Sequence, residues 1–414
     1  MDSLVVEGGQ ILKGKVEVPP AKNAALPLLC LSLLTAEKVS FESLPDVADI
    51  QSMQKMLEHL GVEKLDKNLF QCKTIKSVQA PYEWVRKMRA SILVLGPLLA
   101  RAGRAEVSMP GGCAIGERPV GIHLDGLRAM GATINLENGY IQAECKKLRG
   151  TKFVLDFPTV TGTINLVTAA ALAEGESLLE NVACEPEVVE IVQALRQMGA
   201  KISGEGTSQI KITGVPKLNG LKWQIQPDRI QLLTYLAAGA LTGGEVECTP
   251  YRQGTLNAVV QKFRELGCEM IETSESLRLK APQRLKSIHL ETAPFPGFPT
   301  DGQAQFMACT TLAAGSSTIR ELVFENRFQH VAELRRMGAK IEVDGNTAVI
   351  SGVDHLSGAS VMASDLRASA SLVLAGLSAH GKTKVLRVYH LDRGYEMLEA
   401  KLRKLGAKIT REKE

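Results

Sequence analysis

Apolar residues recur at helical spacing along much of the chain, and short alternating stretches follow them. Between Val188 and Leu195 the apolar positions fall on one face of a helix. The stretch 340–343 alternates in the way of a half-buried strand. Other segments, such as 372–381, are rich in Ala and Leu on nearly every side. A helix that is apolar all round is buried, so we predict buried central helices beside amphipathic outer ones.

A Leu-Gly or Met-Gly dipeptide followed by a small residue ends these amphipathic helical stretches. It occurs at residues 60–62, 130–132, 198–200, 266–268, 337–339 and 405–407. The copies lie about 70 residues apart, and a fixed spacing of this kind marks internal repetition. The glycine is typical of a helix end, and a short strand follows it. We therefore predict six copies of one mixed helix-and-strand unit.

The period of the repeat bears on domain organisation. Thin solenoids have repeats of about 20 to 50 residues, so this longer unit favours two lobes of three copies each. The change of lobe is expected between the third and fourth copies, where 216–228 contains Pro216, Gly220 and Pro227. A cleft between lobes is a favoured place for a ligand.

Composition excludes several classes of function. The chain has 414 residues, of which 45% are hydrophobic and 4% aromatic, and its net charge is +4. Few aromatic residues and a small charge argue against a nucleic-acid partner. No apolar run reaches transmembrane length and no signal peptide is visible, so we expect no membrane association.

The cysteines and histidines do not form known ligand patterns. Eight cysteines are scattered without a CxxC pair, which suggests free thiols in a reducing cytoplasm. The seven histidines are dispersed. There is no HExxH motif, no phosphate-binding GxxxxGK[ST] loop and no redox fingerprint. We predict no metal site and no cofactor.

The segment PGGCAIGERP, residues 110–119, contains the strongest candidate for chemistry. Two glycines allow close approach of the backbone to a ligand, and Arg118 follows Cys113 by five residues. A thiol beside a cation can act as an acid, a base or a nucleophile. The alternative is that Cys113 is a small buried hydrophobe, which is the usual role of a lone cysteine.

Further motifs are distributed over essentially the whole chain. They are AKNAALPLL (21–29), MRAS (88–91), EPE (185–187), PDRI (227–230), GFPTDGQAQ (297–305), ENRF (325–328), DLRA (365–368) and YHLDRGYE (389–396). With the cysteine loop, in this order, they make the chain resemble the enolpyruvyl transferases. The resemblance implies an α/β (α+β) fold, a two-lobed inside-out α/β barrel of six βαβαββ repeats. It also implies lobes of residues 20–227 and of 1–19 with 228–414.

The resemblance implies an activity as well. Family members of this kind move the enolpyruvyl group of phosphoenolpyruvate to the 3-hydroxyl of UDP-N-acetylglucosamine and release phosphate, by addition and elimination. This is the first committed step of peptidoglycan synthesis. The reaction needs a proton donor for the vinyl carbon, a base for the hydroxyl and cations for the phosphate and carboxylate. We expect a cytoplasmic monomer without cofactor or metal.

The resemblance assigns catalytic roles residue by residue. Cys113 protonates the methylene carbon and can hold a covalent adduct, so epoxides similar to fosfomycin are expected to alkylate it. Asp301 lies beside the 3-hydroxyl as the candidate base, with an N-cap for a helix near Gln303 as the alternative. Lys22 and Asn23 meet phosphoenolpyruvate, since a lysine is a compact charge suited to phosphate. Without the motif, Lys22 would be interpreted as a solvated surface charge.

Arginines are expected to bind the anionic groups of the substrates. Arg118 and Arg393 act on phosphoenolpyruvate as the lobes close, and a salt bridge of Arg393 with Asp392 or Glu396 is the alternative. Arg89 contacts the nucleotide sugar. Arg327 and Arg367 match further charged positions of the family at the lobe interface. Glu185, Asp228 and Asp365 match other acidic positions, for which salt bridges are as plausible as chemistry.

A uridine pocket is implied by two further segments. Its residues are Arg118, Pro119, Val120, Gly121, Ile122, Phe157, Pro158, Thr159 and Val160, with Val323 near the sugar. The chain departs from the family pattern here, because Gly121 replaces an Asp that reads the uracil edge and 159–163 is TVTGT. It also has Pro19-Pro20 before the AKN motif and Gln231 where Glu is usual. The expected chemistry is therefore better supported than the preference for uridine.

Two other functions stay open at this point. One is enolpyruvyl transfer to another acceptor, such as a shikimate phosphate, although those enzymes lack the PGGC loop. The other is a non-catalytic paralogue that binds a nucleotide sugar, against which the intact set of charged residues argues.

Overall fold

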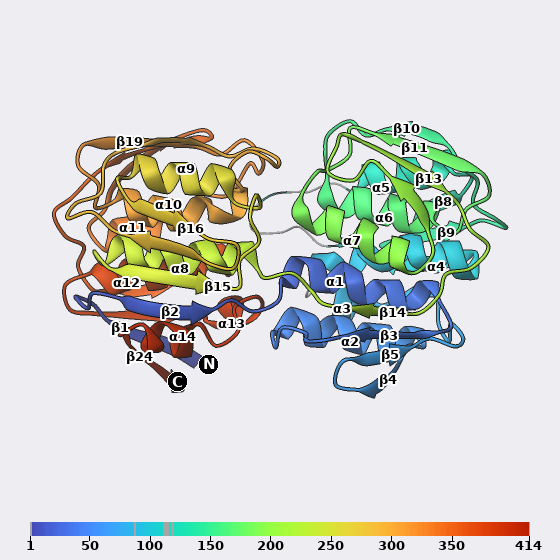
Figure 1. Cartoon of the computed structure of the whole chain (residues 1–414), viewed down its shortest axis with the longest axis horizontal. Coiled ribbons are helices and arrows are strands. Elements are labelled where there is room, and N and C mark those ends of the chain that lie inside the picture. The colour runs from blue at the N-terminus through green and yellow to red at the C-terminus, as the bar shows by residue number, and fades with distance from the viewer. Residues whose placement is uncertain (1, 87, 111–115, 117–119, 414) are drawn as a thin grey trace. The chain divides into compact units, whose positions relative to one another are not determined.

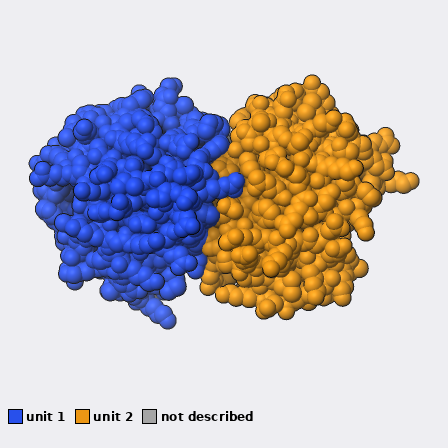
Figure 2. All heavy atoms as spheres, in the orientation of Figure 1, with its two compact units in different colours: residues 1–19, 114–116, 227–414 blue, residues 20–113, 117–226 orange. Residues whose placement is uncertain are grey.

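The computed structural model describes residues 2–86, 88–110, 116 and 120–413 (Figure 1). Contacts divide the chain into two compact units, coloured in Figure 2. Unit 1 comprises residues 1–19, 114–116 and 227–414, and unit 2 comprises 20–113 and 117–226. The lobes of residues 20–227 and of 1–19 with 228–414 stay a prediction.

Each unit contains three four-stranded sheets. In unit 2 they are β14 (Leu221–Trp223), β3 (Lys38–Phe41), β5 (Leu69–Gln71), β4 (Glu63–Asp66); β6 (Gln79–Ala80), β7 (Arg104–Ser108), β9 (Tyr140–Glu144), β8 (Thr133–Glu137); and β10 (Lys152–Val154), β11 (Glu176–Glu180), β13 (Gln209–Thr213), β12 (Lys201–Ser203). In unit 1 they are β16 (Glu269–Glu272), β17 (Leu277–Lys280), β15 (Glu245–Thr249), β2 (Lys13–Glu17); β18 (His289–Glu291), β19 (Ser316–Arg320), β21 (Thr347–Ser351), β20 (Lys340–Asp344); and β22 (Ser360–Met362), β23 (Lys382–Leu386), β1 (Asp2–Glu7), β24 (Lys408–Lys413).

All six sheets have the same pairing pattern. One edge strand pairs in parallel with its neighbour, and the other two pairings are antiparallel, as in the sheet β10-β11-β13-β12. A parallel pair needs a crossover connection, and a helix supplies it, as α6 (Val160–Ala170) does between β10 and β11. The six predicted copies and their βαβαββ pattern are therefore confirmed.

Each unit also contains helical segments. The helical segments of unit 2 are α1 (Lys22–Cys30), η1 (Leu31–Leu34), α2 (Ala48–Leu60), α3 (Tyr82–Val85), η2 (Arg89–Val94), α4 (Leu95–Ala102), α5 (Gly121–Ala129), α6 and α7 (Pro186–Gln197). Those of unit 1 are α8 (Arg229–Leu241), α9 (Asn257–Glu265), η3 (Thr300–Gly302), α10 (Gln303–Thr310), α11 (Val331–Arg336), α12 (Leu366–Ser378), α13 (Tyr389–Asp392) and α14 (Leu398–Lys404). In unit 1, α8, α10 and α12 pack against one another, and every residue of α10 is buried.

The six repeated glycines end helices as predicted. Gly61, for example, lies at the C-terminal end of α2, where its amide donates to the last carbonyls of the helix. The φ angles of the six glycines lie between 93° and 114°. This left-handed region is strained for residues with a Cβ atom, which explains why glycine occurs at each copy.

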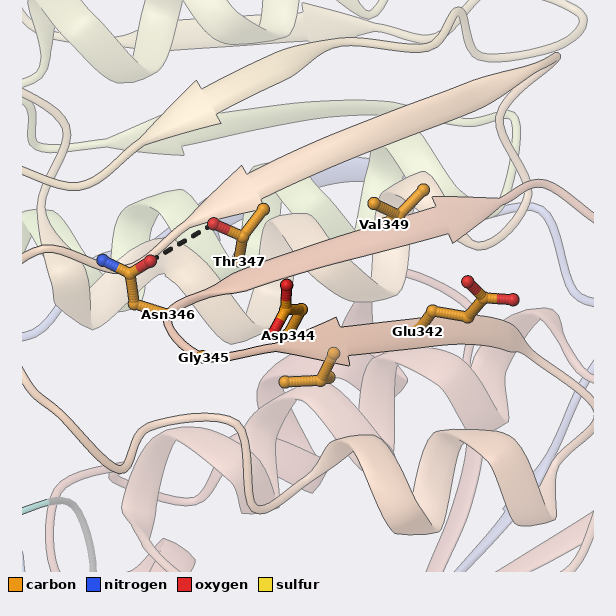
Figure 3. Close-up of a pocket in the computed structure, with 7 residues that line it drawn as sticks. Glu342, Asp344, Gly345, Asn346, Thr347 and Val349 are labelled. Carbon is orange, nitrogen blue, oxygen red and sulfur yellow. Dashed lines mark hydrogen bonds between the residues drawn. The ribbon is translucent and has the colours of Figure 1, made fainter.

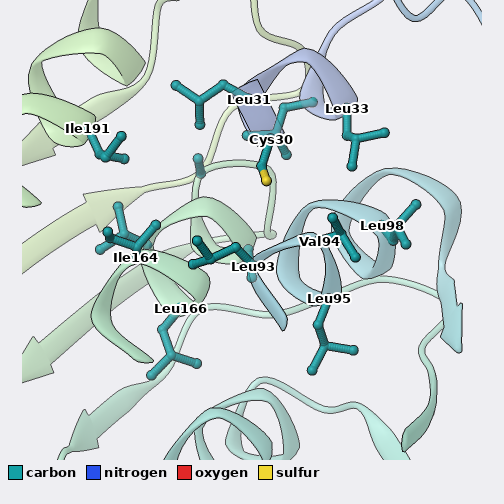
Figure 4. Close-up of a cluster of buried hydrophobic side chains, with 14 of the residues drawn as sticks. Cys30, Leu31, Leu33, Leu93, Val94, Leu95, Leu98, Ile164, Leu166 and Ile191 are labelled. Carbon is teal, nitrogen blue, oxygen red and sulfur yellow. The ribbon is translucent and has the colours of Figure 1, made fainter. Parts of the chain in front are cut away.

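Buried apolar side chains fill the centre of each unit. Figure 4 shows part of the core of unit 2, where Cys30 lies among residues such as Leu95 and Leu166. Burial raises the pKa of the Cys30 thiol, so this cysteine stays protonated and acts in packing. All cysteines that the structure describes are free thiols.

Phe306 supports the helix that follows the turn containing Asp301. Its ring is fully buried on α10, with its centroid 4.5 Å from that of Phe263 and 4.8 Å from that of Phe298. We expect Phe306→Ala to lower the free energy of unfolding by about 3 to 5 kcal/mol, because it leaves a cavity. Urea unfolding measures this, with the half-exposed Leu322→Ala as the control, expected within about 0.5 kcal/mol of wild type. An equal decrease in the free energy of unfolding for Phe306→Ala and Leu322→Ala would contradict the assigned packing.

Candidate functional site

Asp301 of η3 lies between two buried arginines of unit 1. Its Oδ1 accepts a hydrogen bond of 2.6 Å from Arg327, and its Oδ2 accepts one of 2.8 Å from Arg367. The side chains of the arginines are 6% and 5% exposed, whereas that of Asp301 is 26% exposed. The carboxylate is therefore the part of this ion triad that a ligand can approach.

The electrostatics of this triad favour an ionised aspartate. Burial raises the pKa of Asp301, but the charges and hydrogen bonds of Arg367 and Arg327 outweigh that effect and hold the pKa well below its ordinary value. The same pairing raises the pKa of Arg367, against the effect of its burial. At neutral pH the site therefore presents a carboxylate that accepts hydrogen bonds.

The alternative role of Asp301 as a helix cap is wrong. The N-cap of α10 is Gly302, and no side chain caps that helix. The other two aspartates, whose roles stayed open, do cap helices. Asp228 accepts hydrogen bonds from backbone amides at the start of α8, and Asp365 does so for α12.

A buried glutamate supports the Asp301 turn. Glu321, 4% exposed, accepts a hydrogen bond of 2.9 Å from the hydroxyl of Thr300, and Arg327 donates to that hydroxyl at 2.8 Å. Glu321 also accepts from the backbone amides of Val323 and Phe324, at 2.9 and 3.1 Å. The expected sugar neighbour Val323 is thus tied to the same network as Asp301. Neither spacing nor periodicity in the sequence indicated Glu321.

Arg393 directly follows α13 in unit 1. The carboxylate of Asp392, considered as its salt-bridge partner, accepts hydrogen bonds of 2.7 and 3.0 Å from Arg411. Two residues after Arg393, the hydroxyl of Tyr395 accepts a hydrogen bond of 3.3 Å from Arg367. The segment containing Arg393 is therefore connected to the Asp301 triad through Tyr395.

Lys22 is the first residue of α1 in unit 2, and Asn23 is the second. The side chain of Lys22 is only 11% exposed, so its interpretation as a solvated surface charge is wrong. Its Nζ lies 3.3 Å from Oδ2 of Asp49 on α2, whose side chain is 6% exposed. Sequence reasoning missed Asp49, because it lies 27 residues away without any motif.

Arg89 begins η2, and its charge acts on the buried His123 of α5. Burial and the positive charge of Arg89 lower the pKa of His123 to about 3, so the imidazole is neutral at neutral pH. Its Nδ1 accepts a hydrogen bond of 2.9 Å from Asn165 of α6, which also donates to the carbonyl of Ile92 at 2.8 Å. His123 and Asn165 thus connect η2, α5 and α6.

The two expected uridine segments lie at helix starts. Val120 is the N-cap of α5, followed by Gly121 and Ile122, and Thr159 is the N-cap of α6 beside Phe157, Pro158 and Val160. The hydroxyl of Thr161 lies 3.4 Å from Nε2 of His123, which connects the two helices that these segments begin. Free backbone amides at helix starts suit anions. Cys113, Arg118 and Pro119 lie outside the residues that the structure describes.

The pocket in Figure 3 does not involve the predicted site. It lies at the hairpin between β20 and β21. Its lining residues are Glu342, Val343, Asp344, Gly345, Asn346, Thr347 and Val349. Two carboxylates on this hairpin disfavour the anionic ligands that the arginines and Lys22 suit.

The ranges that the structure describes contain no candidate membrane span and no candidate metal cluster. None of their helices combines the length and apolarity that a membrane span needs. Within the same ranges, no group of three or more His, Cys, Asp and Glu side chains has an arrangement that could hold a metal ion.

Comparison with known sequences gives full-length similarity. The family model described as EPSP synthase (3-phosphoshikimate 1-carboxyvinyltransferase) matches residues 6–412. The chain is 53% identical over 414 residues to a protein of Desulfosudis oleivorans named UDP-N-acetylglucosamine 1-carboxyvinyltransferase, covering 99% of each chain.

Comparison with solved structures gives the same fold. The enolpyruvyl transferase NikO from Streptomyces tendae superposes with a TM-score of 0.90 at 24% identity, over 99% of both chains. EPSP synthase from Acinetobacter baumannii has a TM-score of 0.76 at 18% identity, over the full length of both chains. At this identity the likeness establishes the fold alone, and the predicted fold class is confirmed.

Proposed function

Since the chain belongs to the enolpyruvyl transferase family, we propose that it transfers the enolpyruvyl group of phosphoenolpyruvate to the 3-hydroxyl of UDP-N-acetylglucosamine. The observation that carries the choice of acceptor is the 53% identity over 99% of the chain to a relative named for that reaction. The reaction places the protein in peptidoglycan synthesis. We further propose that it acts in the cytoplasm as a monomer.

The chemistry consists of an addition and an elimination. The sugar oxygen forms a bond to C2 of phosphoenolpyruvate while a proton is added to C3. The bond between C2 and the phosphate oxygen then breaks, phosphate leaves, and C3 loses a proton to restore the double bond. C3 therefore gains one proton in the addition and loses one in the elimination. The proton of the sugar hydroxyl is transferred to the protein or solvent.

Asp301 is proposed to act on the sugar hydroxyl. Its two arginines keep it ionised, so it accepts a hydrogen bond from the hydroxyl and orients the attacking oxygen. A carboxylate with a low pKa is a weak base. It suffices because the hydroxyl becomes strongly acidic as its oxygen bonds to C2, so the proton moves late in the addition.

The remaining roles are assigned residue by residue. We propose Cys113 as the proton donor to C3, and Lys22, Asn23, Arg118 and Arg393 as the groups that bind the phosphate and carboxylate. Point charges and forked guanidinium donors suit those anions. The nucleotide sugar is assigned to Arg89, to residues 118–122 and 157–160, to Asp301, and to Val323, which Glu321 connects to the turn of Asp301.

The test is phosphate release from phosphoenolpyruvate, measured with and without UDP-N-acetylglucosamine. Wild type is expected to release phosphate only with the sugar, and Cys113→Ala is expected to abolish release. Cys145→Ala is the matched control, since Cys145 is a free and partly exposed cysteine of unit 2. Release without the sugar, or full activity of Cys113→Ala, would overturn the proposal.

Gly121 gives a separate prediction about nucleotide recognition. A Cβ atom at Gly121 would meet nothing nearer than the carboxylate of Asp125, at 4.0 Å. An acidic side chain at the start of a helix is also favourable. We expect Gly121→Asp to fold and to lower KM for UDP-N-acetylglucosamine by about 3- to 10-fold, through a hydrogen bond to the uracil edge. Gly121→Ala, which adds no carboxylate, should leave KM unchanged, and equal values for all three proteins would refute this role.

A further inference from the structure

Gln231 is a buried amide whose two polar atoms both have partners. It lies on the first turn of α8 and is fully buried. Its Nε2 donates a hydrogen bond of 3.1 Å to the carbonyl of Gly394, and its Oε1 accepts one of 3.1 Å from the hydroxyl of Tyr235. The carbonyl only accepts and the hydroxyl donates, so the amide matches both partners.

The carbonyl that Gln231 holds belongs to the turn containing Arg393. That turn is also held on its other side, because Asp392 is bonded by Arg411 of β24. The pair of Asp392 and Arg411 is partly exposed, with side chains 39% and 28% exposed. Of the two contacts that hold this turn, the one between Gln231 and Gly394 is buried, so solvent screens it less than the pair of Asp392 and Arg411.

The next residue extends this support into the core of unit 1. The hydroxyl of Tyr395 lies 2.8 Å from that of Thr234, one turn along α8. It also accepts hydrogen bonds from Gln305 at 3.2 Å and from Arg367 at 3.3 Å. The turn after Arg393 is therefore fixed to α8, α10 and α12, which are the buried helices of the unit.

We propose that Gln231 is a positioning residue, whose neutral amide holds the backbone of Gly394 and thereby orients Arg393 toward phosphoenolpyruvate. This inference rests on the proposed function, because it takes Arg393 as a ligand of phosphoenolpyruvate. The amide does not ionise, so the support is the same at every pH at which the protein is folded. A carboxyl group at this position donates to Gly394 only while it is protonated.

The surroundings decide how such a carboxyl group would titrate. The ionisable groups near the start of α8 include Asp228, Arg229, Tyr235, Cys248, Arg367, Arg393, Tyr395, Glu396 and Lys401. Arg367 already bonds Asp301, and full burial disfavours charge, so a glutamate at 231 is expected to titrate above its ordinary range. Its protonated, donating form is present below its raised pKa and is lost as the pH rises through it.

The test compares Gln231→Glu with wild type and with Gln261→Glu. The last variant adds the same charge on the exposed face of α9. KM for phosphoenolpyruvate and kcat are measured from about pH 6 to about pH 9. We expect KM of Gln231→Glu to stay near wild type at the acid end and to rise about tenfold at the alkaline end, with a smaller change in kcat. Profiles parallel to those of wild type and Gln261→Glu would overturn the proposal.

Hydrogen exchange provides a readout that does not depend on the proposed function. Gln231→Leu is expected to speed exchange in the segment 389–396 about tenfold while the melting temperature stays above the assay temperature. Unchanged exchange in that segment would also overturn the positioning role. If wild type releases no phosphate, the proposed function fails, and the exchange result alone then decides whether Gln231 holds this turn.

Discussion

Asp301→Asn is expected to lower kcat for phosphate release by about 10²- to 10⁴-fold, the range that a positioned acid or base contributes. The amide keeps the shape of the side chain but cannot take the hydroxyl proton. In wild type, Arg327 and Arg367 each donate a hydrogen bond to one oxygen of the Asp301 carboxylate. The amide of the variant places its NH2 group against one of these two donors. KM for phosphoenolpyruvate should change much less, because its anionic groups are assigned to other residues.

The control is Asp354→Asn, which neutralises a carboxylate of the same unit. Asp354 has a side chain that is 86% exposed and pairs with Arg284 at the surface. The kcat of the Asp354→Asn enzyme should equal that of wild type. Steady-state kinetics of the three proteins distinguishes the outcomes, and an Asp301→Asn enzyme with normal kcat would exclude Asp301 from the chemistry.

The same residue predicts a pH dependence of stability. The folded pKa of Asp301 is depressed, so its contribution is fully present above the unfolded value and is lost as the pH falls through the folded value. Wild type should therefore be more stable than Asp301→Asn at neutral pH, and the difference should shrink in acid. Thermal unfolding across this range measures it, and a constant difference would contradict the assigned ion triad.

Lys22→Met is expected to affect both binding and stability. Loss of a charge assigned to the phosphate should raise KM for phosphoenolpyruvate by about 100-fold or more, because hydrogen bonds between charged groups are the strong ones. The variant also removes an ion-pair partner 3.3 Å from the buried Asp49. Breaking a buried pair costs about 3 kcal/mol or more of folding free energy.

The double variant Lys22→Met with Asp49→Asn separates these two effects. It removes the buried negative charge, so it should recover much of the stability and none of the affinity. Lys76→Met is the control in the same unit, since Lys76 is 61% exposed and its surface pair with Glu63 is worth less than about 1 kcal/mol. Recovered affinity in the double variant would show that Lys22 acts only in folding.

The fold could be predicted largely because its signals are local. Each copy of the repeat ends an amphipathic helix at a glycine, and at Gly338 local backbone strain alone requires that residue, because an added Cβ atom would meet nothing within 4 Å. The buried helices could be recognised for a similar reason, since a helix such as α12 is apolar on nearly every side. Strand pairing across the ends of the chain, such as β1 with β24, was not visible in any local pattern.

The site could be predicted only where a motif contained the residue. Asp301, Arg327 and Arg367 were all named, but their joining into one ion triad depends on residues as many as 66 positions apart. Glu321 and Asp49 were missed, because a buried carboxylate is recognised by its partners and those come from other elements. Pairings of this kind depend on tertiary packing, which the one-dimensional pattern does not contain.

The central claim is the identity of the acceptor, and mass spectrometry of the product tests it most directly. The protein is incubated with phosphoenolpyruvate and equal concentrations of UDP-N-acetylglucosamine and 3-phosphoshikimate. We predict that only the nucleotide sugar gains an enolpyruvyl group, in an amount equal to the phosphate released. An enolpyruvyl group on the shikimate, or no product while the folded protein binds the nucleotide sugar, would contradict the assigned reaction.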